Sequence, residues 1–342
     1  MQRDTHIDIA KGIVIYTVVL GHLVTGIAKE GIFLFHMPFF FLVSGYFHKA
    51  YSDKLVFLKR KSISLLLPYA TYLLIFKGPL LVNNLFEVAA TPGKASLYAF
   101  LLNLAKMAYG GIFLMGNVGV FWFISCLFLT QQLFNLIALR KVSNKKILVL
   151  SLTLYAIAIL AQYLPPLVYP WNLNVVLCSF LFYSLGAIWG GQILKNHSAW
   201  QVFLAAVITA VSVILLYYRY PIAFEMKWSY YGWPVFSPLA ALALTKLVGF
   251  CAYLINRQKI LSAIAAFAGT ASITIMFTHL FFRDLFKSYG HHPWVLSFTI
   301  SFIGCCLHYL FTKNNILKAF LLGDRKAFSY LGKKWSRSEN SA

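Results

Sequence analysis

Ten long apolar runs are the feature of this 342-residue chain that most constrains its fold. A bilayer core is about 30 Å thick, and a helix of about 20 apolar residues crosses it. Only 11% of the residues are charged, whereas a soluble domain carries about 25%. We therefore expect an all-α, polytopic membrane helix bundle with about 10 transmembrane helices. The expected spans cover residues 10–28, 31–48, 65–86, 118–139, 147–164, 172–190, 200–217, 235–255, 262–282 and 294–311.

The distribution of Lys and Arg predicts the orientation of these spans. With the N-terminus in the cytoplasm, 20 of the 30 Lys and Arg fall in cytoplasmic segments, including Arg3 and the clusters at 49–61, 140–146 and 313–337. Cytoplasmic loops are enriched in Lys and Arg, so we expect both termini to be cytoplasmic. Residues 97–117 are apolar enough for an eleventh span, but a span there would reverse the orientation of the second cluster. We expect that segment to be interfacial or re-entrant.

The net charge of +21 does not indicate a nucleic-acid partner. Most of the excess lies beside membrane helices, where orientation and anionic lipid headgroups explain it. We expect residues 1–312 to form one transmembrane domain and residues 313–342 a basic cytoplasmic tail. The first residues are too acidic for a signal peptide, and no small-residue cleavage site follows the first run. All five cysteines lie in apolar runs without a CxxC pair, which favours packing over disulfides or a zinc site.

A stripe of ionisable residues runs along the first apolar run. Asp8, Lys11 and His22 recur with Ile15 and Val18 at three- and four-residue steps. On a helix this spacing puts them on one face, with Lys11 and His22 about 16 Å apart. Ionisable groups are costly in lipid and normally face a protein interior or a water-filled cavity. The stripe therefore indicates chemistry or transport inside the membrane.

Two further histidines are expected at the depth of His22. His36 begins the second span, and His279 lies in the outer half of the ninth, one turn before Arg283. Imidazole accepts and passes on protons near neutral pH, so we expect His22 and His36 to be catalytic and His279 to bind substrate. Ser44 is a further candidate for substrate binding, although Ser44-Gly45 also suits close approach of a neighbouring helix. No HxxxH or HExxH spacing occurs, so we expect no metal.

The cytoplasmic end of the stripe is basic. Lys11 lies near the inner interface, and Arg60 and Lys61 precede the third span. These cations suit a clamp for an anionic, phosphorylated cofactor that enters from the cytoplasm, with Asp8 paired to Lys11 three residues away. The alternative explanation is that the basic run only orients the helices. The aromatic outer loop at 219–233 is likewise either a sugar platform or an interfacial aromatic belt.

Several motifs resemble those of acyltransferase family 3, the multi-span membrane acyltransferases. The two most specific are IDIAKG at 7–12 with LGH at 20–22, and HMPFFFLVSGY at 36–46. Weaker matches follow in family order: LLLPY at 65–69, FWFI at 121–124, PWNL at 170–173, YSLG at 183–186 and SITIMFTH at 272–279. The resemblance implies about ten helices, an acyl-CoA donor that is usually acetyl-CoA, and a hydroxyl acceptor on a cell-envelope glycan or its lipid-linked precursor.

The resemblance also assigns roles to single residues. It makes His22 the essential histidine, with Lys11 in place of the arginine that many members carry. Many members have a basic pair before the Leu-Pro-Tyr run, where this chain has Lys61 and then Ser64. This departure weakens the case for bidentate phosphate recognition.

The resulting prediction is a multi-pass O-acyltransferase (O-acetyltransferase) of a bacterial-type inner membrane. Acetyl-CoA is expected to bind at Lys11, Arg60, Lys61 and Asp8, which places its thioester near His22. Direct transfer and transfer through an acyl-enzyme are both open. The alternative function is a proton-coupled transporter or flippase of an envelope precursor, with the histidines as a proton relay. Transporters commonly show paired repeats, and the sequence shows none by eye.

Overall fold

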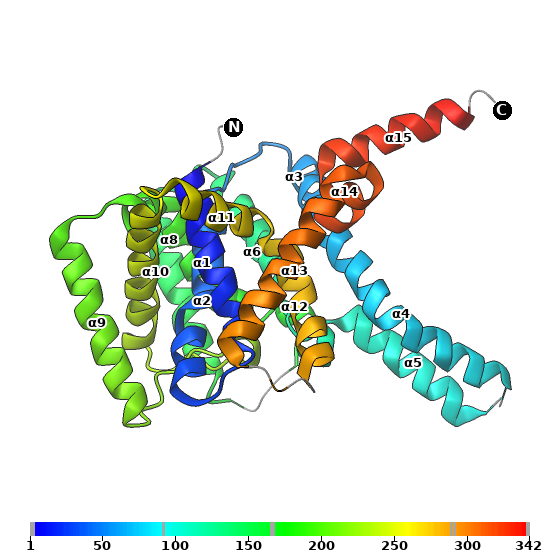
Figure 1. Ribbon diagram of the computed structural model, residues 1–342, viewed down its shortest axis with the longest axis horizontal. Helices are drawn as coiled ribbons and strands as arrows, with labels where there is room; N and C mark the ends of the chain where they lie inside the picture. The colour runs from blue at the N-terminus through cyan, green and yellow to red at the C-terminus, as the bar shows by residue number, and fades with distance from the viewer. Residues whose placement is uncertain (1–3, 91–92, 165–167, 288–289, 291, 340–342) are drawn as a thin grey trace.

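The computed structural model describes residues 4–90, 93–164, 168–287, 290 and 292–339, so the predicted contribution of Arg3 lies outside them. The described residues form an all-helical protein without β-strands (Figure 1). The main helices are α1 (Thr5–Gly21), α2 (Gly26–Tyr46), α3 (Lys54–Lys61), α4 (Leu67–Ala90), α5 (Lys94–Tyr109), α6 (Trp122–Ala138), α7 (Asn144–Ala161), α8 (Val175–Lys195), α9 (Ala199–Tyr217), α10 (Phe236–Ile255), α11 (Lys259–Thr270), α12 (Ser272–Phe286), α13 (Pro293–Lys313), α14 (Asn315–Leu322) and α15 (Arg325–Glu339).

Short turns of other types join some of these helices. They are the π-helix η1 (Ser62–Leu66) and the 3-10 turns η2 (Gly111–Phe113), η3 (Gly116–Val118), η4 (Pro170–Asn172) and η5 (Met226–Trp228). Pro68 explains η1. It has no N–H to donate to the Ser64 carbonyl, and its ring would collide with that carbonyl in an α-helix. The wider π turn relieves this collision at the start of α4.

Each of the ten predicted runs coincides with a helix, but not every run is one continuous span. Within the described chain, eight helices are long and apolar enough to cross a membrane, and the bent pair α11–α12 would make nine. Helix α1 has 17 residues and is about 25 Å long, which is slightly shorter than a bilayer core. The predicted run at 262–282 is broken by a 76° bend between α11 and α12.

The first two helices begin earlier than predicted. Asp4 caps α1, because its carboxylate accepts a hydrogen bond from the Ile7 N–H, and the helix ends at Gly21 rather than at residue 28. The chain then turns at once into α2, which begins at Gly26 rather than at residue 31. His22 is therefore the C-cap of α1. His36 lies in the middle of α2, not at its start.

The predicted interfacial segment at 97–117 is mostly helical. Helix α5 packs along α4, and the two form an arm that projects from the bundle (Figure 1). Large apolar side chains such as Leu85, Phe86 and Leu101 are exposed on this arm. Inside it, the side-chain amide of Asn103 donates to Asn84 Oδ1 at 3.0 Å. Helix α5 is not among the helices that are long enough to span a membrane.

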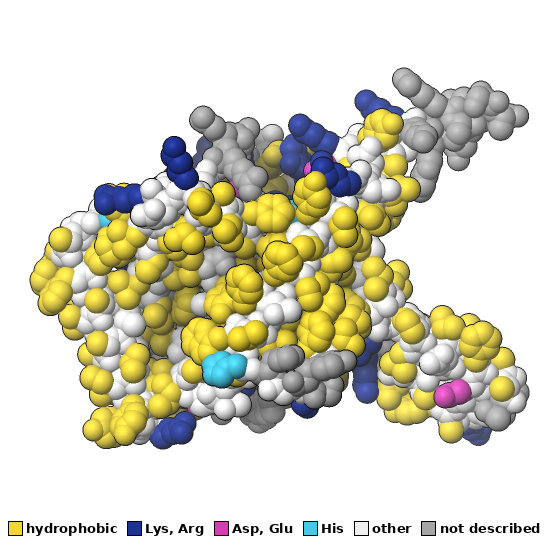
Figure 2. Space-filling model, in the orientation of Figure 1, with side chains coloured by type: hydrophobic (Ala, Val, Ile, Leu, Met, Phe, Trp, Pro, Cys, Tyr) yellow, Lys and Arg dark blue, Asp and Glu magenta, His cyan; other side chains and the backbone are white. Residues whose placement is uncertain are grey.

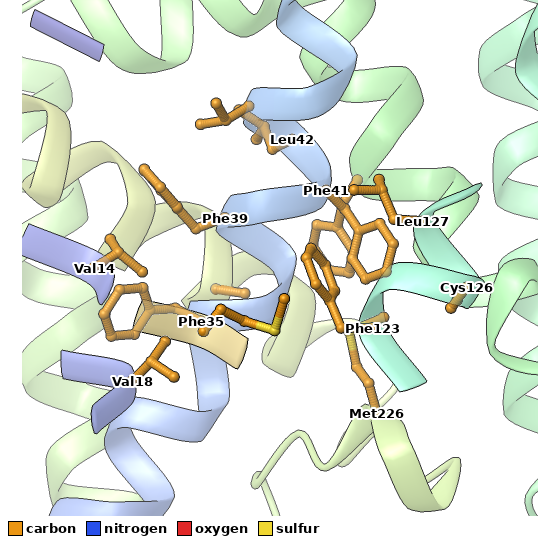
Figure 3. Packing of buried hydrophobic residues seen from close by; sticks show 14 of the residues in the cluster. Val14, Val18, Phe35, Phe39, Phe41, Leu42, Phe123, Cys126, Leu127 and Met226 are labelled. Atoms are coloured by element: carbon orange, nitrogen blue, oxygen red, sulfur yellow. The ribbon is translucent and has the colours of Figure 1, made fainter. Parts of the chain in front are cut away.

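Close helix contacts hold the bundle core together. A Cβ on Gly45 of α2 would lie 1.9 Å from the Tyr183 carbonyl oxygen of α8, and one on Gly186 would lie 1.9 Å from that of Leu42. Small residues let membrane helices approach this closely, which is the packing expected of Ser44-Gly45. On the other side of α2, Phe41 packs edge-on against Phe123 of α6, with ring centroids 5.1 Å apart (Figure 3).

The surface has the distribution of a membrane protein. In Figure 2, hydrophobic side chains cover the sides of the bundle and of the arm, and Lys and Arg gather at its ends. The start of α1 and the helices α14 and α15 lie at the same end of the bundle (Figure 1). We call this the α1-start end.

Candidate active site

A cavity of about 360 Å³ lies near the end of the bundle where α1 finishes, and we call it the outer cavity. Its walls come from the end of α1, the middle of α2, the start of α6, the η3 and η5 loops, and α12. The polar residues in these walls are His22, Lys29, His36, Glu225, Lys227 and Arg283. The predicted catalytic histidines therefore share one cavity.

His22 occupies the most open position of the three histidines. Its backbone N–H continues α1 by bonding to the carbonyls of Val18 and Val19. Its half-buried ring lies 5.2 Å from the His279 ring and 5.3 Å from the Phe33 ring, measured between centroids. None of the hydrogen bonds among described residues involves this ring. The imidazole of His22 is therefore available to a molecule in the outer cavity.

His36 is oriented by its own helix. Its Nδ1 lies 2.9 Å from the Ile32 carbonyl oxygen, and a carbonyl can only accept, so Nδ1 carries the proton. In the neutral ring this leaves Nε2 as an acceptor. The side chain is 5% exposed and reaches the outer cavity.

His279 is fully buried beside His22 and does not line the cavity. Its Nδ1 donates to the carbonyls of Ile275 and Met276 at 3.0 and 2.9 Å, so its Nε2 is an acceptor in the neutral ring. That nitrogen has no hydrogen-bond partner among the described residues. The bend before α12 turns this helix so that His279 contacts α1.

A second cavity of about 270 Å³, the inner cavity, lies nearer the α1-start end. Its polar lining consists of Lys11, Ser44, Lys61, Gln131 and Ser272. The two cavities share four lining residues, Val18, Met37, Phe123 and Met276. They therefore lie end to end, with these four apolar side chains between them.

The predicted cofactor-binding residues fall into two groups. Lys11 lines the inner cavity and pairs with Asp8 at 3.1 Å, as expected, and Lys61 lines the same cavity. Arg60 does not line it. Its guanidinium stacks on the Tyr51 ring, 4.7 Å from the centroid, and its Nε is buried without a hydrogen-bond partner in the part of the chain that the structure describes.

Two polar residues that were not predicted also line the cavities. Gln131 is 5% exposed in the inner cavity, and no described residue forms a hydrogen bond with its Oε1. The sequence signal that could have identified Gln131 is the position of a polar side chain within the apolar run at 118–139. Lys227 lies in η5, and its Nζ donates to the carbonyls of Leu114 and Gly119 at 2.8 and 2.9 Å. Burial lowers the pKa of Lys227 to about 8.

Other charges around the outer cavity are paired. Lys29 lies 4.0 Å from Glu225, and Arg283 lies 2.6 Å from the Asp284 carboxylate. Lys227 has no carboxylate within ion-pair distance among the residues that the structure describes. Nor does this part of the chain bring together three metal-ligating side chains. The groups available for chemistry in the outer cavity are therefore the imidazoles of His22 and His36, in surroundings that are cationic and partly apolar.

Comparison with known proteins agrees with the motifs. A family model described as an acyltransferase domain matches residues 4–311, which include all of the walls of both cavities. Searches of curated proteins and of solved structures returned no match. The family match covers most of the chain, and the helices carry the apolar surface of a multi-pass membrane protein. The chain belongs to acyltransferase family 3 and is a membrane acyltransferase.

Proposed function

We propose that this acyltransferase moves an acetyl group from cytoplasmic acetyl-CoA to a hydroxyl of a cell-envelope glycan or its lipid-linked precursor. The observation that carries the proposal is the end-to-end arrangement of the two cavities. Lys11 and Lys61 line one, and His22 and His36 line the other. Lys11 and His22 are three helical turns apart, about 16 Å, which suits an elongated donor with phosphates at one end and a thioester at the other.

The geometry supports a general-base mechanism at His22. The imidazole takes the proton of the acceptor hydroxyl as the oxygen attacks the thioester carbonyl. The C–S bond then breaks, and the CoA sulfur leaves with the proton that the imidazole held. His36 presents an acceptor nitrogen, so it suits orienting the acceptor hydroxyl rather than donating to the thioester carbonyl.

We assign supporting roles to three further residues. His279 is a positioning residue whose neutral ring lies against His22. Its Nε2, which has no partner among the described residues, carries a lone pair beside the His22 imidazolium formed during the reaction. Asp8 fixes Lys11 through their ion pair. Ser44, in the inner cavity wall, contacts the passing pantetheine arm.

The proposed topology has ten spans, with α1 and the bent pair α11–α12 each counted as one. Both termini are cytoplasmic in a bacterial-type inner membrane, residues 1–312 form the transmembrane domain, and residues 313–342 form the basic tail. Two observations support this proposal. The start of α1 lies at the same end of the bundle as α14 and α15 (Figure 1), and Lys11 and Lys61 line the cavity nearest that end.

The decisive test is His22→Ala in purified protein, assayed by transfer of labelled acetyl from acetyl-CoA to envelope glycans. Loss of a general base should lower kcat about 10²–10⁴-fold and leave the acetyl-CoA KM unchanged. The melting temperature should stay near that of the wild type, because the ring makes no hydrogen bond within the described protein. His308→Ala, on α13 outside both cavities, is the control. Full activity of His22→Ala would contradict the proposed mechanism.

A second variant tests the donor site. Lys11→Ala should raise the acetyl-CoA KM, since Lys11 lines the inner cavity, with little change in kcat. An unchanged KM would show that the inner cavity does not hold the donor phosphates.

A further inference from the structure

The C-terminal helices α14 and α15 lie beyond the family match, which ends at residue 311. Helix α14 nevertheless packs against α4, and α15 packs against η1, near α3 (Figure 1). Asn314 caps α14 by accepting from the Ile316 N–H at 2.8 Å. A small apolar cluster holds the two helices together. It consists of Ala319, Phe320, Ala327, Phe328 and Leu331.

The turn between α14 and α15 docks on the π-helix η1. Gly323 ends α14 with a φ of 63°, and a Cβ there would lie 2.7 Å from the Ser64 carbonyl oxygen and 2.8 Å from that of Ile63. Only glycine combines this backbone conformation with so close an approach. The fold therefore fixes the start of α15 against η1.

This docking brings positive charges together at the inner cavity. Lys61 directly precedes η1 and lines that cavity. Arg325, the first residue of α15, and Arg60 are both close enough to Lys61 to repel its charge. None of these three cations has a carboxylate within ion-pair distance among the described residues, and the nearby Asp324 carboxylate pairs with Lys318 at 3.8 Å.

Like charges held together without a counter-ion destabilise a fold, and an anion between them reverses the sign of the interaction. Guanidinium and ammonium groups bind phosphate well, through charge-assisted hydrogen bonds. We propose that Arg325 and Lys61 form a phosphate-binding site, completed by the C-terminal helices, at the mouth of the inner cavity. The inference rests on the proposed function insofar as the phosphate belongs to acyl-CoA. A lipid headgroup phosphate has the same chemistry.

The test measures binding alone and therefore needs no acceptor. The full-length protein is placed in nanodiscs of phosphatidylcholine, and the affinities of CoA, dephospho-CoA and pantetheine are measured. Arg325→Ala should weaken CoA binding about fivefold, a modest effect because the side chain is exposed. Its affinity for pantetheine, which carries no phosphate, should not change. Lys326→Ala removes the same charge one residue away and should bind CoA like the wild type.

A second pair of variants separates docking from charge. Gly323→Ala should displace α15 and weaken CoA binding about as much as Arg325→Ala does. Gly332→Ala, within α15 where a Cβ meets nothing within 4 Å, is the matched control and should bind normally. If both glycine variants bind CoA normally, α15 does not contribute to the site.

The last part of the experiment identifies the source of the phosphate. Nanodiscs with and without phosphatidylglycerol are compared by thermal stability in the wild type and in Arg325→Ala. If Arg325→Ala keeps its CoA affinity but loses stabilisation by phosphatidylglycerol, the site holds a lipid headgroup. If it changes neither property, the phosphate site is refuted. If the wild type binds no CoA, the proposed donor fails, while the lipid comparison still tests the site.

Discussion

Replacing Lys227 with methionine should loosen the wall of the outer cavity. The Lys227 Nζ ties η5 to the segment between α5 and α6 through the carbonyls of Leu114 and Gly119, at 2.8 and 2.9 Å. The Asn172 side-chain amide holds the same turn by donating to the Lys227 carbonyl at 2.8 Å. Lys227→Met keeps the apolar stem of the side chain and removes the charge with both bonds.

The structure sets the size of the effect. A hydrogen bond to a charged group contributes about 1.5–3 kcal/mol. Desolvation of the Lys227 ammonium opposes these two bonds. The lowering of its pKa from 10.5 to about 8 corresponds to a desolvation cost of roughly 3 kcal/mol. Screening by solvent reduces this cost to about 2 kcal/mol, because the group is partly exposed. The net loss of stability should be about 1–3 kcal/mol, which lowers the melting temperature of a chain of this length by about 1–4 °C.

The lowered pKa of Lys227 also predicts how the stability of the wild type changes with pH. Folded Lys227 loses its proton near pH 8, whereas an unfolded lysine keeps its proton to about pH 10.4. In this window the unfolded state binds more protons, so stability rises with pH. The stability gained when Lys227 loses its proton is complete above about pH 10.4 and is lost as the pH falls through 8. Lys227→Met has no such titration.

The assay is thermal unfolding of the wild type and of Lys227→Met in one detergent from pH 7 to pH 10. The stability difference between them should widen above pH 8. Lys29→Met is the control: its partner Glu225 lies 4.0 Å away and both side chains are well exposed, so its effect should stay below about 1 kcal/mol. A difference that is already absent at pH 7, or that narrows toward pH 10, would refute the reasoning.

Three further predictions concern other parts of the protein. Gln131→Met should add up to about 1 kcal/mol of stability by removing an unpartnered buried oxygen and should raise the acetyl-CoA KM several-fold; Gln132→Met, outside the cavity, should leave that KM unchanged. Burial lowers the pKa of His48 to about 4, so its contribution to stability is complete above about pH 6.5 and is lost as the pH falls toward 4. His48→Gln should therefore flatten this part of the acid-unfolding curve. Gly186→Ala places a Cβ 1.9 Å from a carbonyl oxygen of α2 and should lower the melting temperature clearly, whereas Gly191→Ala, in ordinary contact space, should not.

The apolar runs predicted the helices because lipid leaves a chain few alternatives. A backbone in hydrocarbon must satisfy its own hydrogen bonds, so hydropathy alone located helices at all ten runs. Local spacing also predicted the Asp8–Lys11 pair, since residues three apart on a helix are neighbours. The end of α1 at residue 21 and the start of α2 at residue 26 were not predicted, because Leu23 and Val24 in the turn are apolar and hide the boundary.

Contacts between distant segments could not be predicted from local patterns. Arg60 stacks on Tyr51 and does not line the inner cavity, whereas its neighbour Lys61 does. The bend before α12 interrupts an apolar run that carries no proline, and its only local signal is Gly269 and Ser272 at the bend. Lys227 finds its partners more than a hundred residues earlier in the chain. In each case the sequence shows which residues are present but not which distant residues they contact in the fold.

The proposed reaction requires movement of the apolar side chains between the two cavities. Val18, Met37, Phe123 and Met276 line both cavities, so the thioester end of the proposed donor would have to pass between them to reach His22. Two of the four are methionines, whose unbranched side chains move aside at little cost, whereas β-branched residues there would be stiffer. The same four side chains separate the lysines of the inner cavity from the histidines of the outer cavity. Apolar surroundings disfavour unpaired polar and charged groups, so this boundary would limit the passage of protons along the proposed substrate path.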